Sequence, residues 1–357
     1  MKFRFRIPHS QLCGPIRWGA FRNSKGVALV MVLWVVTILS VIALEFCFAM
    51  RTEINIAKNY KEELQLYALA EGGVQRAITE LIYRNDQTIH QMRKTSNPDG
   101  TSPAEKEWVT DGRPYLLPFD LNECEIRVMS EGGKVNINLV SEVLLRKIIG
   151  NLGLEAEQRD IVVDSIMDWR DPDDLVRLNG AENDYYQSLK EPYFCKNGNL
   201  DSIGELLLVR GVTPDLFNGM KAKGKEDGSK GDSPGLKDIF SIYSPMGQID
   251  INSAAPAALR ALLGIPSEIA GHIVKAREEK IFENQPDLLQ RVPELTPFFA
   301  EVGPLIVFQS TTPYYTIESR AKNKGGGTNR ALKVIVKIDP NEKKNYKIIQ
   351  WVDSITP

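Results

Sequence analysis

The apolar positions of the chain begin with an unbroken run from Val27 to Met50, in which Glu45 is the only charged residue. As an α-helix this run would span roughly 36 Å, more than the roughly 30 Å hydrocarbon core of a bilayer. Beyond the run, apolar and small residues recur every three or four positions as far as Leu81, which is the spacing of one helix face. The pattern predicts one helix from Val27 to about Met92, which crosses a membrane over residues 27–50.

Short segments of strand pattern lie on both sides of a long central block. We expect them to form one antiparallel sheet against the later half of the helix, so that residues 51–138 and 310–357 build a small α+β domain. The predicted strands are Tyr115–Leu117, Glu123–Met129, Lys134–Asn138, Tyr314–Ala321, Ala331–Ile338 and Tyr346–Val352, with a loop over Ser96–Pro114, a turn at 131–133 and a hairpin turn at 324–328.

The central block, residues 139–309, is predicted to be helical, in short pieces separated by turn signals. It contains an internal repeat, because residues 135–138 (Val-Asn-Ile-Asn) and 249–252 (Ile-Asp-Ile-Asn) each precede two short helices joined by a tight turn. The turns, including a third variant, lie at Gly153, Gly211 and Gly264. These are features of helix-hairpin-helix units. The predicted fold class is therefore α+β, with a large all-α domain inserted into the sheet domain.

Helix-hairpin-helix units commonly bind a DNA phosphate through backbone amides, in a Gly-hydrophobic-Gly turn that lets the phosphate approach. Here the second glycine is replaced by Glu155, Thr213 and Pro266. Glu155 would repel a phosphate, and Pro266 has no N–H to donate. We therefore expect a packing role for these units, with a membrane-anchored DNA-binding receptor as the alternative function.

The charge distribution also favours a packing role over DNA binding. Residues 1–26 carry six lysines and arginines and no acid, so they are expected to stay on the cytoplasmic side of the membrane while the bulk of the chain lies outside. The formal net charge of the whole chain is −2, and without this leader it is −2 − 6 = −8. An acidic protein is a poor partner for nucleic acid.

Few residues suggest catalysis. The histidines His9, His90 and His272 form no cluster, and no Ser–His–Asp arrangement is visible, so we expect no catalytic residues. An exported enzyme with a catalytic metal is the weakest alternative. Cys124 and Cys195 would meet an oxidising compartment, where they could pair or remain free.

The densest group of charges is a loop in the central block, with six carboxylates within 17 residues, opposed by Arg170 and Arg177. Oxygen ligands on a flexible loop suit Ca²⁺, which takes six to eight of them. The spacing is not that of an EF-hand, and composition alone favours a solvated loop. The mixed-charge segment Lys221–Lys237 is also predicted to be a solvated loop.

The junction Lys25-Gly26, placed directly before the apolar run, resembles the class III signal of prepilins. The resemblance implies that a prepilin peptidase cuts after Gly26, that the new amine of Val27 is methylated, and that the apolar helix stays on the mature chain. Pilin-like subunits usually carry Glu at the fifth mature position, where this chain has Met31. A subunit without that carboxylate fits the end of a filament.

Several motifs together resemble the large minor pseudopilins of type II secretion systems: the leader, Asp168-Trp169-Arg170-Asp171-Pro172-Asp173-Asp174, Asn179-Gly180-Ala181-Glu182-Asn183-Asp184-Tyr185-Tyr186, and Leu206–Pro214. That family implies a pilin-like fold and a single-pass protein of the bacterial inner membrane, periplasmic except for its N-terminus. It implies no enzymatic activity, but a filament tip that initiates or caps assembly and supports export of folded proteins across the outer membrane. The implied partners are GspI and GspJ, with GspH and the major pseudopilin GspG below. The implied cofactor is calcium, with candidate ligands Asp168, Asp171, Asp173, Asp174, Glu182 and Asp184.

Overall fold

The computed structural model describes residues 24–84, 88, 92, 108–119, 122–220, 233–245, 247–325 and 329–354. The chain forms two compact units, residues 1–62 and residues 63–357. The predicted leader up to residue 23, most of the loops predicted over 96–114 and 221–237, and the tip of the hairpin turn at 326–328 lie outside the described residues.

The first unit contains the beginning of helix α1 (Ser24–Arg84). Every side chain described from Gly26 to Lys61 is exposed, including the whole apolar run. By length and composition, Gly26–Arg84 is a helix that could cross a membrane. The long apolar helix predicted from the sequence is thus confirmed, and most of its predicted extension from residue 85 to Met92 lies outside the described residues.

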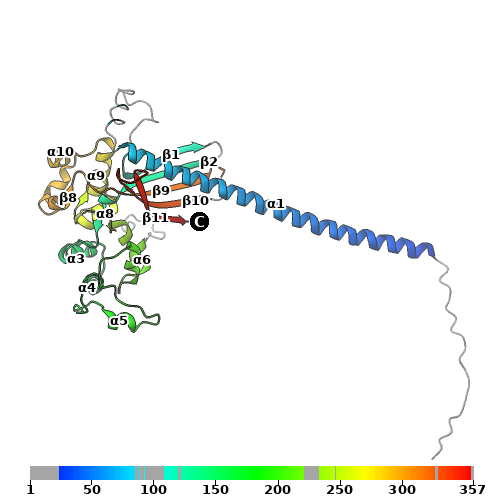
Figure 1. Cartoon of the computed structure of the whole chain (residues 1–357), viewed down its shortest axis with the longest axis horizontal. Helices are drawn as coiled ribbons and strands as arrows, with labels where there is room; N and C mark the ends of the chain where they lie inside the picture. Colours follow the sequence, from blue (N-terminus) through cyan, green and yellow to red (C-terminus); the bar gives the residue numbers. More distant parts are fainter. Residues whose placement is uncertain are drawn as a thin grey trace, which may run out of the picture. The chain divides into compact units, whose positions relative to one another are not determined.

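The second unit contains a five-stranded antiparallel sheet in the order β1-β2-β9-β10-β11 (Figure 1). Its central pairing joins β2 to β9, strands from the two sides of the central block, as expected. β1 begins inside the predicted loop. The strands are β1 (Asp111–Phe119), β2 (Asn122–Ser130), β9 (Tyr314–Asn323), β10 (Asn329–Ile338) and β11 (Tyr346–Ser354).

One face of this sheet packs against α1 from Leu66 onward. The closest approach is at Gly73, where an added Cβ would lie 2.4 Å from the Ser319 hydroxyl and 2.8 Å from the Cys124 sulfur. The Ser319 hydroxyl donates to the Ala70 carbonyl of the helix at 2.7 Å. The sheet core is therefore fixed by direct contact between helix backbone and strand side chains.

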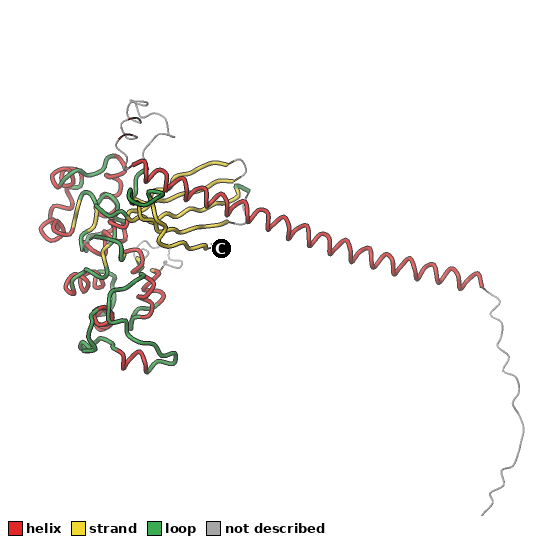
Figure 2. The backbone as a smooth tube through the Cα atoms, in the orientation of Figure 1, coloured by secondary structure: helices red, strands yellow, loops and turns green. Residues whose placement is uncertain are grey.

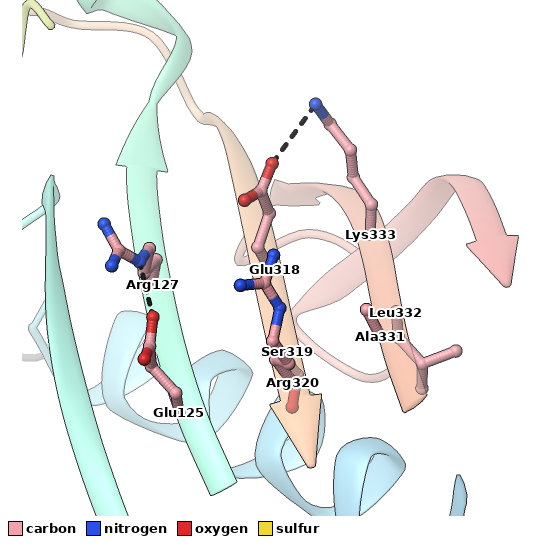
Figure 3. Close-up of a pocket in the computed structure, with 8 residues that line it drawn as sticks. All are labelled: Glu125, Arg127, Glu318, Ser319, Arg320, Ala331, Leu332 and Lys333. Carbon is pink, nitrogen blue, oxygen red and sulfur yellow. Dashed lines mark hydrogen bonds and ion pairs between the residues drawn. The ribbon is translucent and has the colours of Figure 1, made fainter. Parts of the chain in front are cut away.

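The other face of the sheet carries opposite charges on neighbouring strands (Figure 3). Glu318 pairs with Lys333 at 3.3 Å, and Glu125 pairs with Arg127 at 2.8 Å along one strand. Arg320 stands directly across from Glu125. These residues surround a hollow of about 160 Å³. Opposite charges placed across strands stabilise a sheet by about 0.2–1 kcal/mol a pair, which accounts for the pattern without a ligand.

The prediction of a sheet strand at Lys134–Asn138 is wrong. Its first residues form β3 (Val135–Asn136), which pairs in parallel with β6 (Phe240–Ser241) and not with the five-stranded sheet. Residues 131–133, predicted as a hairpin turn, form the short 3₁₀-helix η1 (Glu131–Gly133). The reason is burial, because Val135 and Ile137 both belong to the core of the helical body.

The helical body lies between β2 and β9 in the chain, as short helices separated by loops (Figure 2). In the second half of the helical body, the two short strands β7 and β8 pair in parallel. Its elements after β3 are α3 (Glu142–Gly150), α4 (Ala156–Arg170), α5 (Asn183–Gln187), η2 (Ile203–Leu208), α6 (Pro214–Asn218), β4 (Gly219–Met220), β5 (Ser233–Pro234), α7 (Leu236–Ile239), β6, β7 (Ile249–Asp250), α8 (Pro256–Leu263), α9 (Ser267–Glu279), α10 (Gln285–Arg291), η3 (Pro293–Phe298), α11 (Phe299–Val302), η4 (Gly303–Leu305) and β8 (Ile306–Val307).

The two copies of the predicted internal repeat make equivalent hydrogen bonds. In the first copy Arg170 donates to the carbonyls of Ile137 and Val140, both at 2.6 Å. In the second copy Arg277 donates to the carbonyls of Ile251 and Ala254, at 2.9 and 2.7 Å. The asparagine that ends each tetrapeptide also exchanges two hydrogen bonds with a distant backbone, Asn138 with Leu200 and Asn252 with Phe282. Two equivalent modules therefore make up the helical body.

The three predicted hairpin turns are also observed. Gly153 joins α3 to α4 with φ at 81°, and Gly264 joins α8 to α9 with φ at 67°. Gly211, with φ at 84°, lies between η2 and α6. This left-handed conformation is the reason that glycine occupies each turn.

The buried guanidinium of Arg277 gives a first prediction. Replacing Arg277 by Met should lower the free energy of unfolding by about 2 kcal/mol, because two carbonyls lose their donor inside the core. Replacing Lys275, an exposed cation on the same helix, by Met should change it by less than about 0.5 kcal/mol. Urea unfolding of both variants measures the difference, and equal stability of the two would show that the carbonyls do not need the guanidinium.

The two cysteines of the second unit do not pair. Cys124 lies in the sheet core and Cys195 in the core of the helical body, and both are free thiols. Both cores consist of residues from Leu66 onward. Residues 51–357, called the soluble fragment below, therefore contain all that either core needs and should fold without the apolar run.

Candidate metal centre

The acidic loop begins on α4 and ends at α5. Asp168 is 0% exposed at the end of α4, Asp171 caps that helix, and Glu182 is 5% exposed just before α5. Their charges act on one another, since both aspartates raise the pKa of Glu182 and Asp171 raises that of Asp168. These three residues are called the acidic cluster below, and within it Asp168 and Glu182 are buried while Asp171 is partly exposed.

The acidic cluster holds oxygens without donors. Oδ1 of Asp168, Oδ1 of Asp171 and both oxygens of Glu182 are buried and accept no well-directed hydrogen bond from the described residues. The thiol of Cys195, a weak donor, makes its hydrogen bond to the backbone carbonyl of Asp168, with sulfur and oxygen 4.0 Å apart. A buried acceptor left unpaired costs about 1–3 kcal/mol, so such a group calls for a cation or a proton.

Burial displaces the pKa values of the acidic cluster upward. Loss of hydration raises the pKa of Asp168 to about 6 and that of Glu182 to about 7. Burial also raises the pKa of Asp171, and the neighbouring charge of Asp173 adds to the effect. The fold therefore keeps these carboxylates in a state where a bound positive charge would be strongly stabilising.

Arg177 supplies part of that positive charge. Its guanidinium lies 3.2 Å from Oδ1 of Asp168 and 3.5 Å from Oδ2 of Asp171, and it also reaches Glu142 at 3.2 Å. Arg170, the other cation of the loop, instead binds backbone carbonyls of the first module. Arg177 thus makes the ion pairs with the acids, while Arg170 acts on Asp171 through its charge alone.

The other three predicted ligands are exposed. Asp173 accepts a hydrogen bond from the backbone of Leu175, and Asp174 accepts from the amides of Asn183 and Asn197. Asp184 lines a pocket of about 350 Å³ together with Asp174 and Glu182. The six carboxylates are not gathered into one coordination sphere, and among the described residues no group of three or more His, Cys, Asp or Glu is arranged to hold a metal ion.

Two features of the site escaped the sequence analysis. Asn197 has a buried Oδ1 without a donor and a φ of 48°, in the left-handed region that asparagine tolerates. Its place in Lys196-Asn197-Gly198, a turn-like stretch, is the only local signal. Gly180 is the second feature, because a Cβ there would lie 1.8 Å from Oδ2 of Asp168.

The raised pKa values predict how stability depends on pH. A carboxylate whose pKa is raised in the folded state contributes stability that is complete at low pH and is lost as pH rises through the raised value. The calcium-free soluble fragment should therefore become more stable, by about 2 kcal/mol, between pH 7.5 and about 5.5. Urea unfolding after metal removal measures this change, and Asp168→Asn should reduce it. Stability that falls over this range would contradict the raised pKa values of Asp168 and Glu182.

Comparison with known proteins shows which chains resemble this one. Residues 119–222 match the family model described as type II secretion system (T2SS), protein K, and residues 245–301 match the helix-hairpin-helix motif. A putative type II secretion system protein K of Escherichia coli K12 is 25% identical over 204 residues, 55% of this chain and 60% of the relative. The type II secretion system protein K of Pseudomonas aeruginosa is 24% identical over 284 residues, 77% and 78% of the two chains.

A solved structure has the same fold. A chain in the crystal structure of the GspK-GspI-GspJ complex from the type 2 secretion system of enterotoxigenic Escherichia coli matches with a TM-score of 0.53. The match covers 84% of this chain and 99% of that chain, at 15% sequence identity. The predicted combination of a long helix, an antiparallel sheet and a helical insertion is therefore an established architecture.

Proposed function

Because this chain is a relative of type II secretion system protein K, or GspK, we propose that it is a minor pseudopilin at the tip of the type II secretion pseudopilus. The observation that carries the proposal is the fold. The chain begins with an apolar helix long enough to cross a membrane, and the later part of the same helix packs against the sheet. A helical body is inserted between β2 and β9. The protein acts as a structural subunit of the export machinery and not as an enzyme.

The N-terminal part would anchor and process the subunit. The basic leader keeps the N-terminus in the cytoplasm, and the run from Val27 to Met50 holds the chain in the inner membrane with its bulk in the periplasm. Prepilin peptidase would cut after Gly26 and Val27 would be methylated. Gly26 and Val27 are both exposed residues in the first turn of α1, so the cut would remove only Ser24–Gly26 from the described helix.

The partners proposed are GspI and GspJ, which form a complex with GspK in the structural relative. GspH and the major pseudopilin GspG would lie below them in the filament. The helical body adds a second hydrophobic core that the sheet does not need for its own packing. A subunit of that size, without a Glu at Met31 to meet a neighbour above, would initiate or cap the filament and so support export of folded proteins.

Calcium is the cofactor proposed for the acidic cluster. Asp171 and Glu182 supply buried oxygens without donors, Asn197 supplies a carbonyl oxygen of the same kind, and Asp168 supplies a buried oxygen whose near cation is Arg177. The exposed Asp173, Asp174 and Asp184 belong to the same loop and complete the candidate set. A calcium ion would neutralise the buried charges and so hold the loop after α4 in one conformation. The protein residues already position Asp168, through the backbone N–H of Arg177 at 3.2 Å.

Reconstitution tests the proposal. The soluble fragment, mixed with soluble fragments of GspI and GspJ from the same bacterium, should elute from a sizing column as one ternary complex. Cells that lack the chain should accumulate exported proteins in the periplasm until it is restored. Two results together would overturn the assignment. The fragment would elute alone although both partners are present, and cells that lack the chain would export proteins normally.

The alternative of a DNA receptor has one observation in its favour, the helix-hairpin-helix match over residues 245–301. The chemistry of that hairpin opposes it. Pro266 is the N-cap of α9 and offers no N–H to a phosphate, and the side chain of Asn151 packs beside Gly264. A gel shift of duplex DNA by the soluble fragment at low salt discriminates the two functions, because tight binding would favour the receptor.

A further inference from the structure

We propose that β11 accepts an extended segment of another protein as a further strand of the sheet. The segment would carry acidic side chains towards a cleft beside β11 and aliphatic side chains towards the opposite face. This cleft, called the β11 cleft below, has a volume of about 240 Å³ and is lined by residues of both the sheet and the helical body. The inference requires neither calcium nor a filament.

The two edge strands of the sheet differ in how well they are protected. β1 and β11 each have only one neighbouring strand among the described residues. β1 contains Pro114 and Pro118, which have no N–H to offer to an added strand. β11 contains no proline, and from Gln350 to Ser354 it pairs residue by residue with β10, after a register shift that precedes this stretch. β11 therefore presents a regular edge at which a further strand can pair.

The face of the sheet that packs on α1 is incompletely covered at this edge. Ile348 of β11 lies opposite Val336 of β10, whose side chain is 0% exposed, yet Ile348 itself is 38% exposed. The difference arises because Ile348 has a neighbouring strand on one side only. An added strand would place every second side chain on this face, where aliphatic residues would cover Ile348.

The opposite face of β11 borders the β11 cleft. On this face Val352 lies opposite Lys333, and Gln350 lies opposite Ile335. These four residues line the cleft from the side of the sheet, and residues of η2, α6, α7 and β6 line it from the side of the helical body. The remaining side chains of a strand added to β11 would therefore lie beside Val352, at the cleft.

The charge of the β11 cleft favours an acidic segment. Its lining contains Lys134, Lys237 and Lys333 but only one carboxylate, that of Glu131. Glu131 is 2% exposed and already accepts three hydrogen bonds, one of them from the Lys134 ammonium at 3.2 Å. The described lining is thus basic, although the chain without its leader carries a net charge of −8.

Two of these lysines are available to a ligand. Lys237 donates to the neutral side-chain amide of Asn218 at 3.0 Å, and not to a carboxylate. Lys333 pairs with Glu318 at 3.3 Å, but both side chains are exposed to water, which weakens the pair (Figure 3). Carboxylates on an added strand would therefore meet cations whose charge the fold compensates only in part.

A second copy of this chain is a less suitable partner. The β11 residues that line the cleft, Gln350 and Val352, carry no charge. Asp353 lies on the other face, opposite the buried Leu332. Pairing of two β11 strands would bring no carboxylate to the lysines of the cleft. Charge complementarity therefore favours a different protein, with an acid at every second position of the paired segment.

A labelled peptide of four Glu-Val repeats tests the inference on the soluble fragment. Fluorescence anisotropy at low salt should show binding, and a Lys-Val peptide of the same length should bind at least about tenfold more weakly. Amide hydrogen exchange in the presence of the Glu-Val peptide should slow in β11 and stay unchanged in β1, the other edge. Absence of binding, equal binding of the two peptides, or unchanged exchange in β11 would each overturn the inference.

Variants of Lys237 test the part played by the cleft. Lys237→Glu should weaken binding of the Glu-Val peptide about three- to tenfold, whereas Lys237→Arg should bind nearly as the wild type does. Lys275→Glu makes the same change of charge at an exposed position of α9 and should leave the affinity unchanged. Equal affinities of Lys237→Glu and Lys275→Glu would show that the cleft does not select the peptide.

Light scattering of the fragment without peptide tests the self-pairing alternative. The inference predicts a monomer whose β11 amides exchange at a rate independent of protein concentration. A dimer in which protection of β11 rises with concentration would show that this edge joins two copies of the chain, and it would overturn the proposal of an acidic partner.

Discussion

Replacing Gly73 by Val should lower the free energy of unfolding of the soluble fragment by about 3 kcal/mol or more. A Cβ at this position would lie 2.4 Å from the Ser319 hydroxyl, 2.8 Å from the Cys124 sulfur and 3.2 Å from Ile126, all fixed in the buried sheet. The clash would also strain the hydrogen bond from Ser319 to the Ala70 carbonyl. Helix and sheet would have to separate, and the sheet core lies between them.

Gly72 is the matched control, because a Cβ at this neighbouring position meets nothing within 4 Å. Gly72→Val should leave stability nearly unchanged, since Val costs a helix slightly less than Gly does. Urea unfolding followed by circular dichroism measures both variants. If Gly73→Val is as stable as Gly72→Val, then α1 does not pack on the sheet at this point.

The second large effect concerns calcium. The wild-type soluble fragment should gain about 4 kcal/mol of stability when calcium is present at about a thousand times its dissociation constant. Asp168→Asn and Glu182→Gln should lose most of that gain, because each removes a charge from the buried part of the site. Without calcium both variants should be at least as stable as the wild type, because burial disfavours the charged form of both carboxyl groups and raises their pKa values.

That combination separates ion binding from a merely structural role, which would destabilise the calcium-free protein as well. Glu191→Gln, at an exposed acid of the same region, is the control and should respond to calcium as the wild type does. Thermal unfolding with calcium and with a chelator gives all four comparisons. A calcium response in Asp168→Asn equal to that of the wild type would remove the acidic cluster from the site.

The elements that local pattern can specify were predicted well. β2, β9, β10 and β11 each lie within two residues of the predicted bounds at either end, because one face of each meets α1 and the alternation of apolar residues follows from that burial. The hairpin turns of the helical body were recognisable for a similar reason. A left-handed turn needs glycine whatever its surroundings.

Long-range contacts explain the errors. β3 has the composition of a sheet strand, yet its partner is β6, more than a hundred residues further along the chain. No local pattern distinguishes that pairing from a place in the five-stranded sheet. For the same reason, the sequence did not distinguish the buried candidate ligands from the exposed ones. Helix periodicity on α4 accounts for the burial of Asp168, whereas the path of the loop decides that Asp173 and Asp184 are exposed. Asn197 comes from a separate stretch of chain.

The mass of the mature N-terminus, determined on protein from native membranes, tests the central assignment most directly. The account predicts a chain that begins at Val27 with a methylated amine, because prepilin peptidase would have cut after Gly26. Protein that still begins at Met1, or that begins beyond Met50 without the apolar run, would contradict the assignment to the pseudopilins.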